Sequence, residues 1–196
     1  MRQRINFLII LFTISLSLIS CTKDFLNVPI QGQESPSLDP TIALDLVTGA
    51  YNSLITPDAT EASGFGGYDI HGIMFITVTN IISDDADKGS FASDQPDCEA
   101  IDNFTVTSSN SYLDPLWKGY YAGISRTNQA IAALAIAALP DTVIKVRTAE
   151  MRFIRAYYYF NLVRMFGGVP IVLNVPSGPR DNDSSFFTRA SDSDCL

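Results

Sequence analysis

Histidine and cysteine are scarce in this sequence, which has one histidine, His71, and three cysteines among its 196 residues. No cysteine or histidine stands near another at the spacing of metal ligands, and three cysteines cannot form a disulfide framework. The sequence therefore predicts no metal site and no cofactor. Cys21 has a separate role, argued below. A disulfide between Cys98 and Cys195 stays open, although nothing in their spacing requires one.

Basic residues are also few, with 13 Lys and Arg against 21 Asp and Glu. The first 20 residues hold two of the bases and no acid, which leaves 11 against 21 and a net charge of −10 for the remainder. An acidic chain is a poor partner for nucleic acid and for anionic lipid headgroups. Any attachment to a membrane must therefore come from a covalent lipid.

No apolar run in the chain reaches the length of about 20 residues that a membrane-spanning helix needs. The longest, Ile5 to Ile19, is interrupted by a few polar residues and follows Arg2 and Arg4. A basic start, a short apolar stretch and a small residue at its end are typical of a signal peptide. We expect residues 1–20 to be that signal.

The signal ends in Leu18-Ile19-Ser20-Cys21, which resembles a bacterial lipobox. The resemblance implies cleavage between Ser20 and Cys21 and acylation of Cys21, which becomes the membrane anchor. The alternative is an ordinary secretory signal with a chance cysteine at its end. Residues 21–38 are expected to form a lipidated tether, because prolines and a glycine interrupt any regular element there.

A helical domain is expected from residue 39 onward. Asp39 can cap a helix over 41–54 that Pro40 starts and Pro57 ends. Its apolar residues at helical spacing are Leu44, Val47, Tyr51 and Leu54.

Two longer helices are predicted over 114–139 and 142–166. The first has an apolar face that includes Trp117, Tyr120, Tyr121, Ile124, Ile131, Leu134 and Ala138. The second has Val143, Val146, Phe153, Tyr157, Phe160 and Val163 three or four residues apart. Leu139-Pro140-Asp141 separates them, and Gly167-Gly168 stops the second. We expect an antiparallel pair in which the Trp117 face packs on the Phe153/Tyr157/Phe160 face. The fold class is all-α, with tetratricopeptide-like helix pairs, long loops and little sheet.

The sequence between the first predicted helix, 41–54, and the helix over 114–139 is less informative. Residues 69–82 are apolar and β-branched, so that a helix and a strand are both plausible. Residues 83–111 form a long polar segment that contains Asp84, Asp85, Asp87, Asp94, Asp97 and Asp102. Loops of this length are usually functional or disordered, and the sequence offers no way to choose.

No catalytic arrangement emerges. Gly64-Phe65-Gly66-Gly67 lacks the context of a phosphate loop, and a plain loop is favoured. Asp85-Ala86-Asp87-Lys88-Gly89 has the wrong ligand order for a calcium loop, so a solvated acidic turn is favoured. His71 is expected to be packed or at the surface. The aromatic face of Trp117, Tyr120 and Tyr121 could stack on sugar rings, but core packing is favoured. Arg152, Arg155 and Arg164 are expected to bind Glu150 or a neighbouring helix rather than ligand.

The second long helix resembles the most recognisable segment of the SusD/RagB family. That segment runs Ala149-Glu150-Met151-Arg152-Phe153-Ile154-Arg155-Ala156-Tyr157-Tyr158-Tyr159-Phe160, and continues from Leu162 to Pro170. Four weaker features agree in order: Cys21 with Asp24-Phe25-Leu26 and Pro29; Gly49-Ala50-Tyr51; Trp117 to Ile124; and Asn128 with Ala130.

The resemblance implies an α-rich, non-enzymatic lipoprotein of the cell outer membrane that faces the cell surface. Such a protein binds nutrient, either an oligosaccharide or a peptide, and acts as a lid on a TonB-dependent, SusC-like transporter. Ligand-contacting residues cannot be named from the sequence, and residues 83–111 are the preferred location. The alternatives are a structural or assembly lipoprotein that uses helix pairs to hold a partner protein, and a tethered hydrolase.

The last residues depart from the family pattern. Ser191 to Leu196 do not resemble the helix expected after Phe186 to Ala190. We expect residues 39–190 to be an incomplete SusD-like N-terminal domain, and residues 191–196 to be an out-of-frame or truncated tail.

Overall fold

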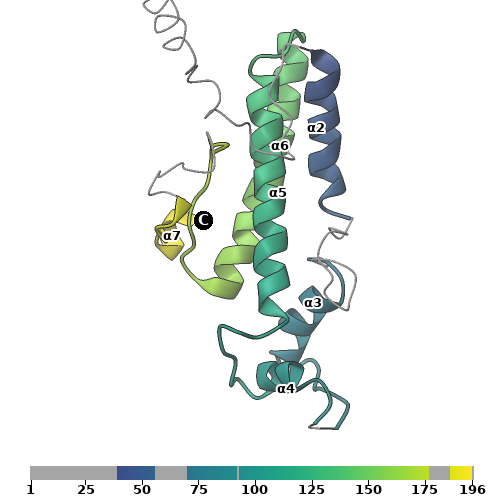
Figure 1. Ribbon diagram of the computed structural model, residues 1–196, viewed down its shortest axis with the longest axis vertical. Helices are drawn as coiled ribbons and strands as arrows, with labels where there is room; N and C mark the ends of the chain where they lie inside the picture. The colour runs from purple at the N-terminus through teal and green to yellow at the C-terminus, as the bar shows by residue number, and fades with distance from the viewer. Residues whose placement is uncertain (1–38, 56–69, 92, 177–185, 196) are drawn as a thin grey trace, which may run out of the picture. The chain divides into compact units, whose positions relative to one another are not determined.

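The computed structural model describes residues 39–55, 70–91, 93–176 and 186–195, and these are mainly helical (Figure 1). In chain order the helices are α2 (Pro40–Asn52), α3 (Ile73–Ile76), the π-helix η2 (Thr77–Ile81), α4 (Pro96–Asp102), α5 (Leu113–Leu134), α6 (Asp141–Phe166) and α7 (Asp192–Cys195). All belong to one compact unit, Pro36–Val175 with Asn182–Leu196. In the described ranges, the only β-type pairing is an isolated bridge between Pro170 and Arg189. The all-α prediction is confirmed.

Helix α2 begins as predicted, because Asp39 Oδ1 accepts a hydrogen bond of 2.8 Å from the Thr41 N–H. The buried face is different from the predicted one: Leu44 and Tyr51 are 37% and 40% exposed. Of the predicted residues Val47 is buried, together with Ala43 and Ala50, which were not predicted. Small side chains on this face let α2 lie close to α5, and the longer ones turn outward.

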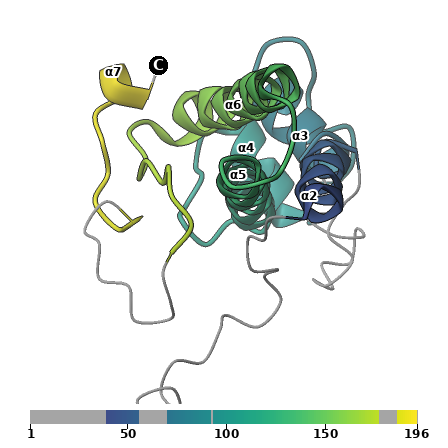
Figure 2. The ribbon, with the colours of Figure 1, turned by 90° about the horizontal axis from the view of Figure 1, so that it is seen from above.

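Helices α5 and α6 form the predicted antiparallel pair, and α2 packs against both (Figure 2). Helix α5 ends at Leu134, five residues before the predicted end, and turns follow before Pro140. Helix α6 agrees with its predicted range and ends at Gly167, whose φ of 68° lies in the left-handed region that glycine tolerates.

The core lies between these three helices. Its largest fully buried side chains include Leu116, Tyr120, Ile124, Leu134, Met151, Tyr158 and Leu162. Gly123 on α5 faces Tyr158 on α6, and a Cβ at this glycine would overlap the tyrosine ring. The hydroxyl groups of Tyr158 and Ser53 lie 2.7 Å apart, which connects α6 to the end of α2.

The predicted contact between the Trp117 face and the Phe153/Tyr157/Phe160 face is wrong. Phe153 is 75% exposed and Phe160 is 47% exposed, because α2 and α5 cover the other side of α6. Trp117 packs instead against Phe166, edge to face with ring centroids 5.1 Å apart. Residues 157–160 are all aromatic, so spacing alone could not tell which side of α6 is buried.

The segment before α5 is helical where the sequence left helix and strand open. Helix α3 continues directly into η2. The Thr79 hydroxyl donates to the Phe75 carbonyl at 2.8 Å, a type of bond that competes with the backbone ladder and bends helices. Within the described ranges, no helix combines the length and apolar character that crossing a membrane requires.

Residues 83–91 and 93–111 contain helix α4, which the sequence did not predict. Three bonds hold this region together: the Lys88 N–H donates to Asp102 at 3.2 Å, the Ser111 N–H donates to Asp97 at 3.0 Å, and the Tyr112 hydroxyl donates to Gln95 at 2.6 Å. The polar side chains thus make bonds within the segment.

Residues 191–196, which the sequence analysis expects to be an out-of-frame or truncated tail, include the four-residue helix α7. Helix α7 contacts α6. The origin of this tail stays a prediction.

Candidate functional site

A groove of about 670 Å³ runs along the side of α6 that α2 and α5 leave uncovered. One wall is α6 itself, and the other includes Ile171, Leu173 and Asp194. The α6 wall carries two exposed rings, Phe153 and Phe160. This aromatic groove is large enough for a small ligand, and its lining mixes apolar surface with a few charged groups.

The segment 169–173 forms the second wall because buried polar groups hold its backbone. The Tyr159 hydroxyl accepts from the Val172 N–H at 2.6 Å and donates to the Val172 carbonyl at 3.1 Å. Asn128 Nδ2 donates to the same carbonyl at 2.9 Å, and the Tyr121 hydroxyl donates to the Pro170 carbonyl at 2.8 Å. These bonds fix the wall before any ligand binds.

Arg155 sits under the groove and completes this network. Its Nη1 donates to Asn128 Oδ1 at 2.7 Å and to the Leu173 carbonyl at 3.2 Å. Burial lowers the pKa of Arg155 from its usual value, and the neighbouring charge of Arg152 adds to that effect. The prediction that Arg155 binds a neighbouring helix is confirmed, since Asn128 belongs to α5. Glu150 pairs with Arg147 at 2.8 Å, a partner that the sequence did not predict.

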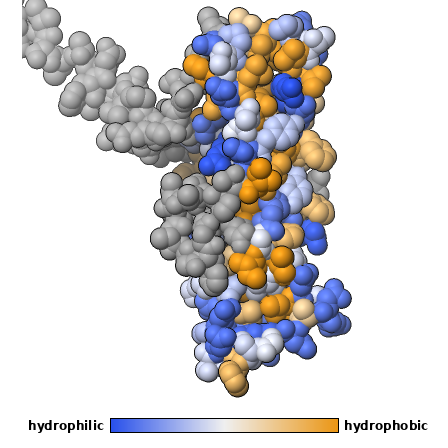
Figure 3. All heavy atoms as spheres, turned by 90° about the vertical axis from the view of Figure 1, so that its right-hand side faces the viewer, coloured by the Kyte–Doolittle hydropathy of each residue, from blue (hydrophilic) through white to orange (hydrophobic). Residues whose placement is uncertain are grey.

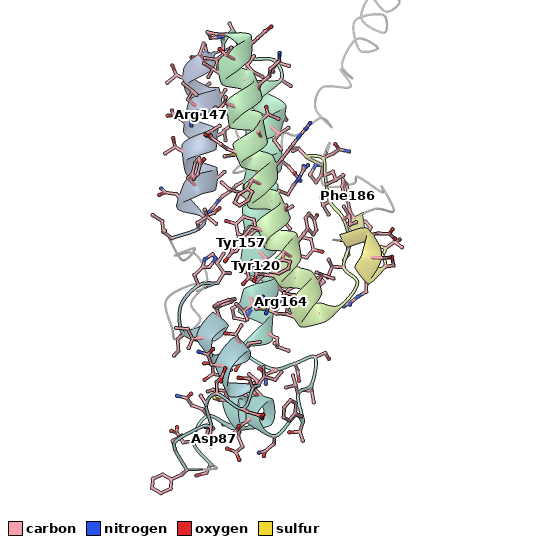
Figure 4. The ribbon with its side chains drawn as sticks, turned by 180° about the vertical axis from the view of Figure 1, so that it is seen from behind. Asp87, Tyr120, Arg147, Tyr157, Arg164 and Phe186 are labelled. Atoms are coloured by element: carbon pink, nitrogen blue, oxygen red, sulfur yellow. The ribbon has the colours of Figure 1, made fainter. Side chains whose placement is uncertain are left out.

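Phe153, Phe160 and Arg164 follow one another along the same side of α6, seven and four residues apart. The Arg164 guanidinium lies 5.1 Å from the centre of the Phe160 ring, in cation–π contact. Figure 4 shows Arg164 toward the C-terminal end of α6 and Arg147 toward its N-terminal end. The exposed aromatic row therefore ends in a positive charge.

Residues 83–111, the predicted location of the ligand, contribute to a second depression. It has a volume of about 310 Å³ and lies between η2, α4, α5 and α6, with Thr79, Asn161 and Arg164 as its polar residues. Two phenylalanines of this region, Phe91 and Phe104, are 85% and 73% exposed. That the ligand binds in this region stays a prediction.

Two other candidates from the sequence, His71 and Tyr120, pack against neighbouring residues. His71 Nε2 lies 2.8 Å from the Tyr157 hydroxyl and the two rings stack, which agrees with a packed histidine. Tyr120 is fully buried, and its hydroxyl donates to the Ile70 carbonyl at 3.2 Å. The prediction of core packing is confirmed for Tyr120.

Cys98 is buried and free, so it does not pair with Cys195. In the part of the chain that the structure describes, no three His, Cys, Asp or Glu side chains are grouped to hold a metal ion. Asp85 to Gly89 lie in that part, whereas Cys21 and Gly64 to Gly67 lie outside the described residues.

The helix pair and the groove define an all-α protein with tetratricopeptide-like packing. Residues 70–194 match a SusD-like family described as "Starch-binding associating with outer membrane". The chain therefore belongs to the SusD-like family, and the resemblance found in the sequence is confirmed.

Individual relatives agree with this assignment. The chain is 26% identical over 174 residues to SusD-like protein P2 of Formosa agariphila, an alignment that covers 87% of this chain and 31% of that protein. A solved structure called a laminarin binding SusD-like protein is 25% identical, with a TM-score of 0.59, and is matched over 81% of this chain and 32% of its own. Surface glycan-binding protein A from Bacteroides fluxus shares the fold, at 24% identity and a TM-score of 0.62 over 81% of this chain and 31% of its own. The chain thus spans about a third of the length of these relatives.

Proposed function

We propose that this chain belongs to a non-enzymatic lipoprotein that binds glycan at the cell surface and passes it to a TonB-dependent, SusC-like transporter of the outer membrane. Membership of the SusD-like family supports the glycan ligand, as do the names of two relatives that refer to glycan and laminarin. The lipid on Cys21 is the proposed membrane anchor.

The aromatic groove is the proposed glycan-binding surface, and its exposed rings are the observation that carries the proposal. Phe153 and Phe160 are exposed, although Ile154, Tyr158 and Leu162 of the same helix are buried in the core. Sugar rings present apolar C–H faces that stack on aromatic side chains, while their hydroxyl groups need hydrogen-bonding partners at the rim. Arg152 and Asp194 supply such partners in the lining.

The test is calorimetry on the full chain in detergent, with a panel of oligosaccharides from surface polysaccharides. The double variant Phe153→Ala/Phe160→Ala should abolish binding. Phe187→Ala is a matched control, because Phe187 is 74% exposed, compared with 75% for Phe153, and lies outside the groove. Binding that survives the double change but is lost in Phe91→Ala would move the site to residues 83–111.

A further inference from the structure

The aromatic groove is positively charged in a chain of net charge −8. Its lining includes two arginines, Arg152 and Arg155, and one acid, Asp194. Arg164 lies directly beyond Phe160. The fourth arginine of α6, Arg147, is neutralised by Glu150 at 2.8 Å and lies outside the groove.

The two arginines of the groove differ in their hydrogen bonds and in their exposure. Arg155 is held by Asn128 and by the Leu173 carbonyl, so its charge is fixed beneath the groove. Arg152 is exposed and close enough to lower the pKa of Arg155 by repulsion. Two arginines that line one groove with a single acid favour an anion between or above them. Asp194 only partly offsets them, and its Oδ2 accepts a hydrogen bond of 2.6 Å from the Ser191 hydroxyl.

We propose that the glycan of this groove is anionic, a sugar that carries a carboxylate or a sulfate ester. This proposal rests on the proposed function. Its ring stacks on Phe153 and Phe160, and its charged group binds Arg152. Guanidinium groups only donate hydrogen bonds, and their planar fork matches the paired oxygens of a carboxylate or sulfate. A neutral sugar would leave the positive charge of the groove without an opposite charge.

The experiment is calorimetry on the full chain in detergent with three oligosaccharides of equal length: an oligogalacturonate, a sulfated carrageenan oligosaccharide and a neutral laminarin oligosaccharide. The two anionic ligands should bind more tightly than the neutral one, and high salt should weaken them. Preference between uronate and sulfate distinguishes the two sources of charge.

Variants locate the effect. Arg152→Gln should weaken anionic binding by about tenfold or more, as expected for the loss of one charge-assisted hydrogen bond. Asp194→Asn should strengthen it severalfold, because it removes the acid of the groove. Arg147→Gln is the matched control on the same helix and should change nothing.

The inference would be overturned if the neutral oligosaccharide bound as tightly as the anionic ones and Arg152→Gln had no effect. If that binding still depended on Phe153, the proposed function would remain intact. If no glycan of either kind bound the chain, both would fail.

Discussion

Gly123 shows how little tolerance the helix pair has at a single residue. The ring of Tyr158 lies against its α-carbon, so Gly123→Ala forces the ring or the helices apart. We expect the change to lower the free energy of unfolding by about 1 to 3 kcal/mol, the usual cost of overpacking. Thermal melting followed by circular dichroism measures it.

The matched control is Gly49→Ala on α2, where no atom lies within 4 Å of the added Cβ. That change should stabilise the chain by roughly 1 kcal/mol through helix propensity. Equal stability of the two variants would contradict the packing described for α5 and α6.

Two buried tyrosines make stability dependent on alkaline pH. Burial raises the pKa of Tyr120 and that of Tyr158 above the usual value, mainly because the phenolate cannot be solvated. Below about pH 10 both states are protonated and the stability is complete; as the pH rises further, the unfolded chain ionises first and stability falls.

The melting temperature should therefore decrease as the pH rises from about 10 toward 12. Tyr120→Phe, which also loses the bond to the Ile70 carbonyl, should start less stable and decrease less over the same range. Parallel pH curves for the variant and the unchanged chain would show that Tyr120 does not contribute.

Among the elements, α4 ends in an unusual way. The Thr105 N–H donates to the Ala100 carbonyl at 2.9 Å and the Phe104 N–H to the Ile101 carbonyl at 3.2 Å, which is the Schellman pattern. Phe104, with φ of 56°, occupies the position that normally holds glycine. Its ring is 73% exposed, so core packing does not offset the backbone strain.

Phe104→Gly should therefore raise the free energy of unfolding by roughly 1 kcal/mol, by relieving the left-handed conformation. Phe91→Gly is the control, because Phe91 is also largely exposed, at 85%, and lies in the same region but has no positive φ. Differential scanning calorimetry should show a higher melting temperature only for Phe104→Gly.

The wall of the groove depends on Asn128. Asn128→Ala removes the acceptor of the Arg155 guanidinium and one donor to the Val172 carbonyl. A hydrogen bond to a charged group contributes about 1.5 to 3 kcal/mol, and we expect a loss in that range together with faster hydrogen exchange at residues 169–173. Gln129→Ala is the control, since its amide bonds only to Ser125 on the same helix. Unchanged exchange at residues 169–173 would contradict the network.

The sequence predicts the ends of α6 well because Pro140 and Gly167 interrupt the backbone in ways that depend only on local geometry. It predicts the faces poorly. Met151 and Ile154 are buried while Phe153 is exposed, since the position of α2 and α5 decides burial on a helix with aromatic residues on every side. The bonds of Asn128 and Tyr159 to segment 169–173 are long-range and leave no periodic pattern in the sequence.

For the molecule as a whole, exposed apolar side chains extend beyond the groove. Ile73 and Ile76 are each 48% exposed and Val146 is 56% exposed. The face of the molecule that carries α2 also mixes apolar and polar surface (Figure 3). Apolar surface of this kind suits a protein partner as well as a glycan. The assembly alternative therefore keeps a physical basis, and the calorimetry proposed above decides between the two.

Attachment to the membrane is a property of the whole chain. The net charge of the protein opposes it, whereas a lipid on Cys21 would favour it. Beyond residues 1–20, the expected signal peptide, the net charge is −10, which opposes binding to anionic headgroups. The lipobox resemblance implies three acyl chains on Cys21, which at about 0.8 kcal/mol for each buried CH₂ would hold the protein firmly. We therefore expect a fatty-acid probe to label the unchanged chain and to leave Cys21→Ala unlabelled and released from membranes.

Cys98→Ala, which removes a buried thiol, is the control and should be labelled normally. High salt should release neither the unchanged chain nor Cys98→Ala, because the attachment is not electrostatic. Membrane retention of Cys21→Ala would show that another part of the chain is the anchor.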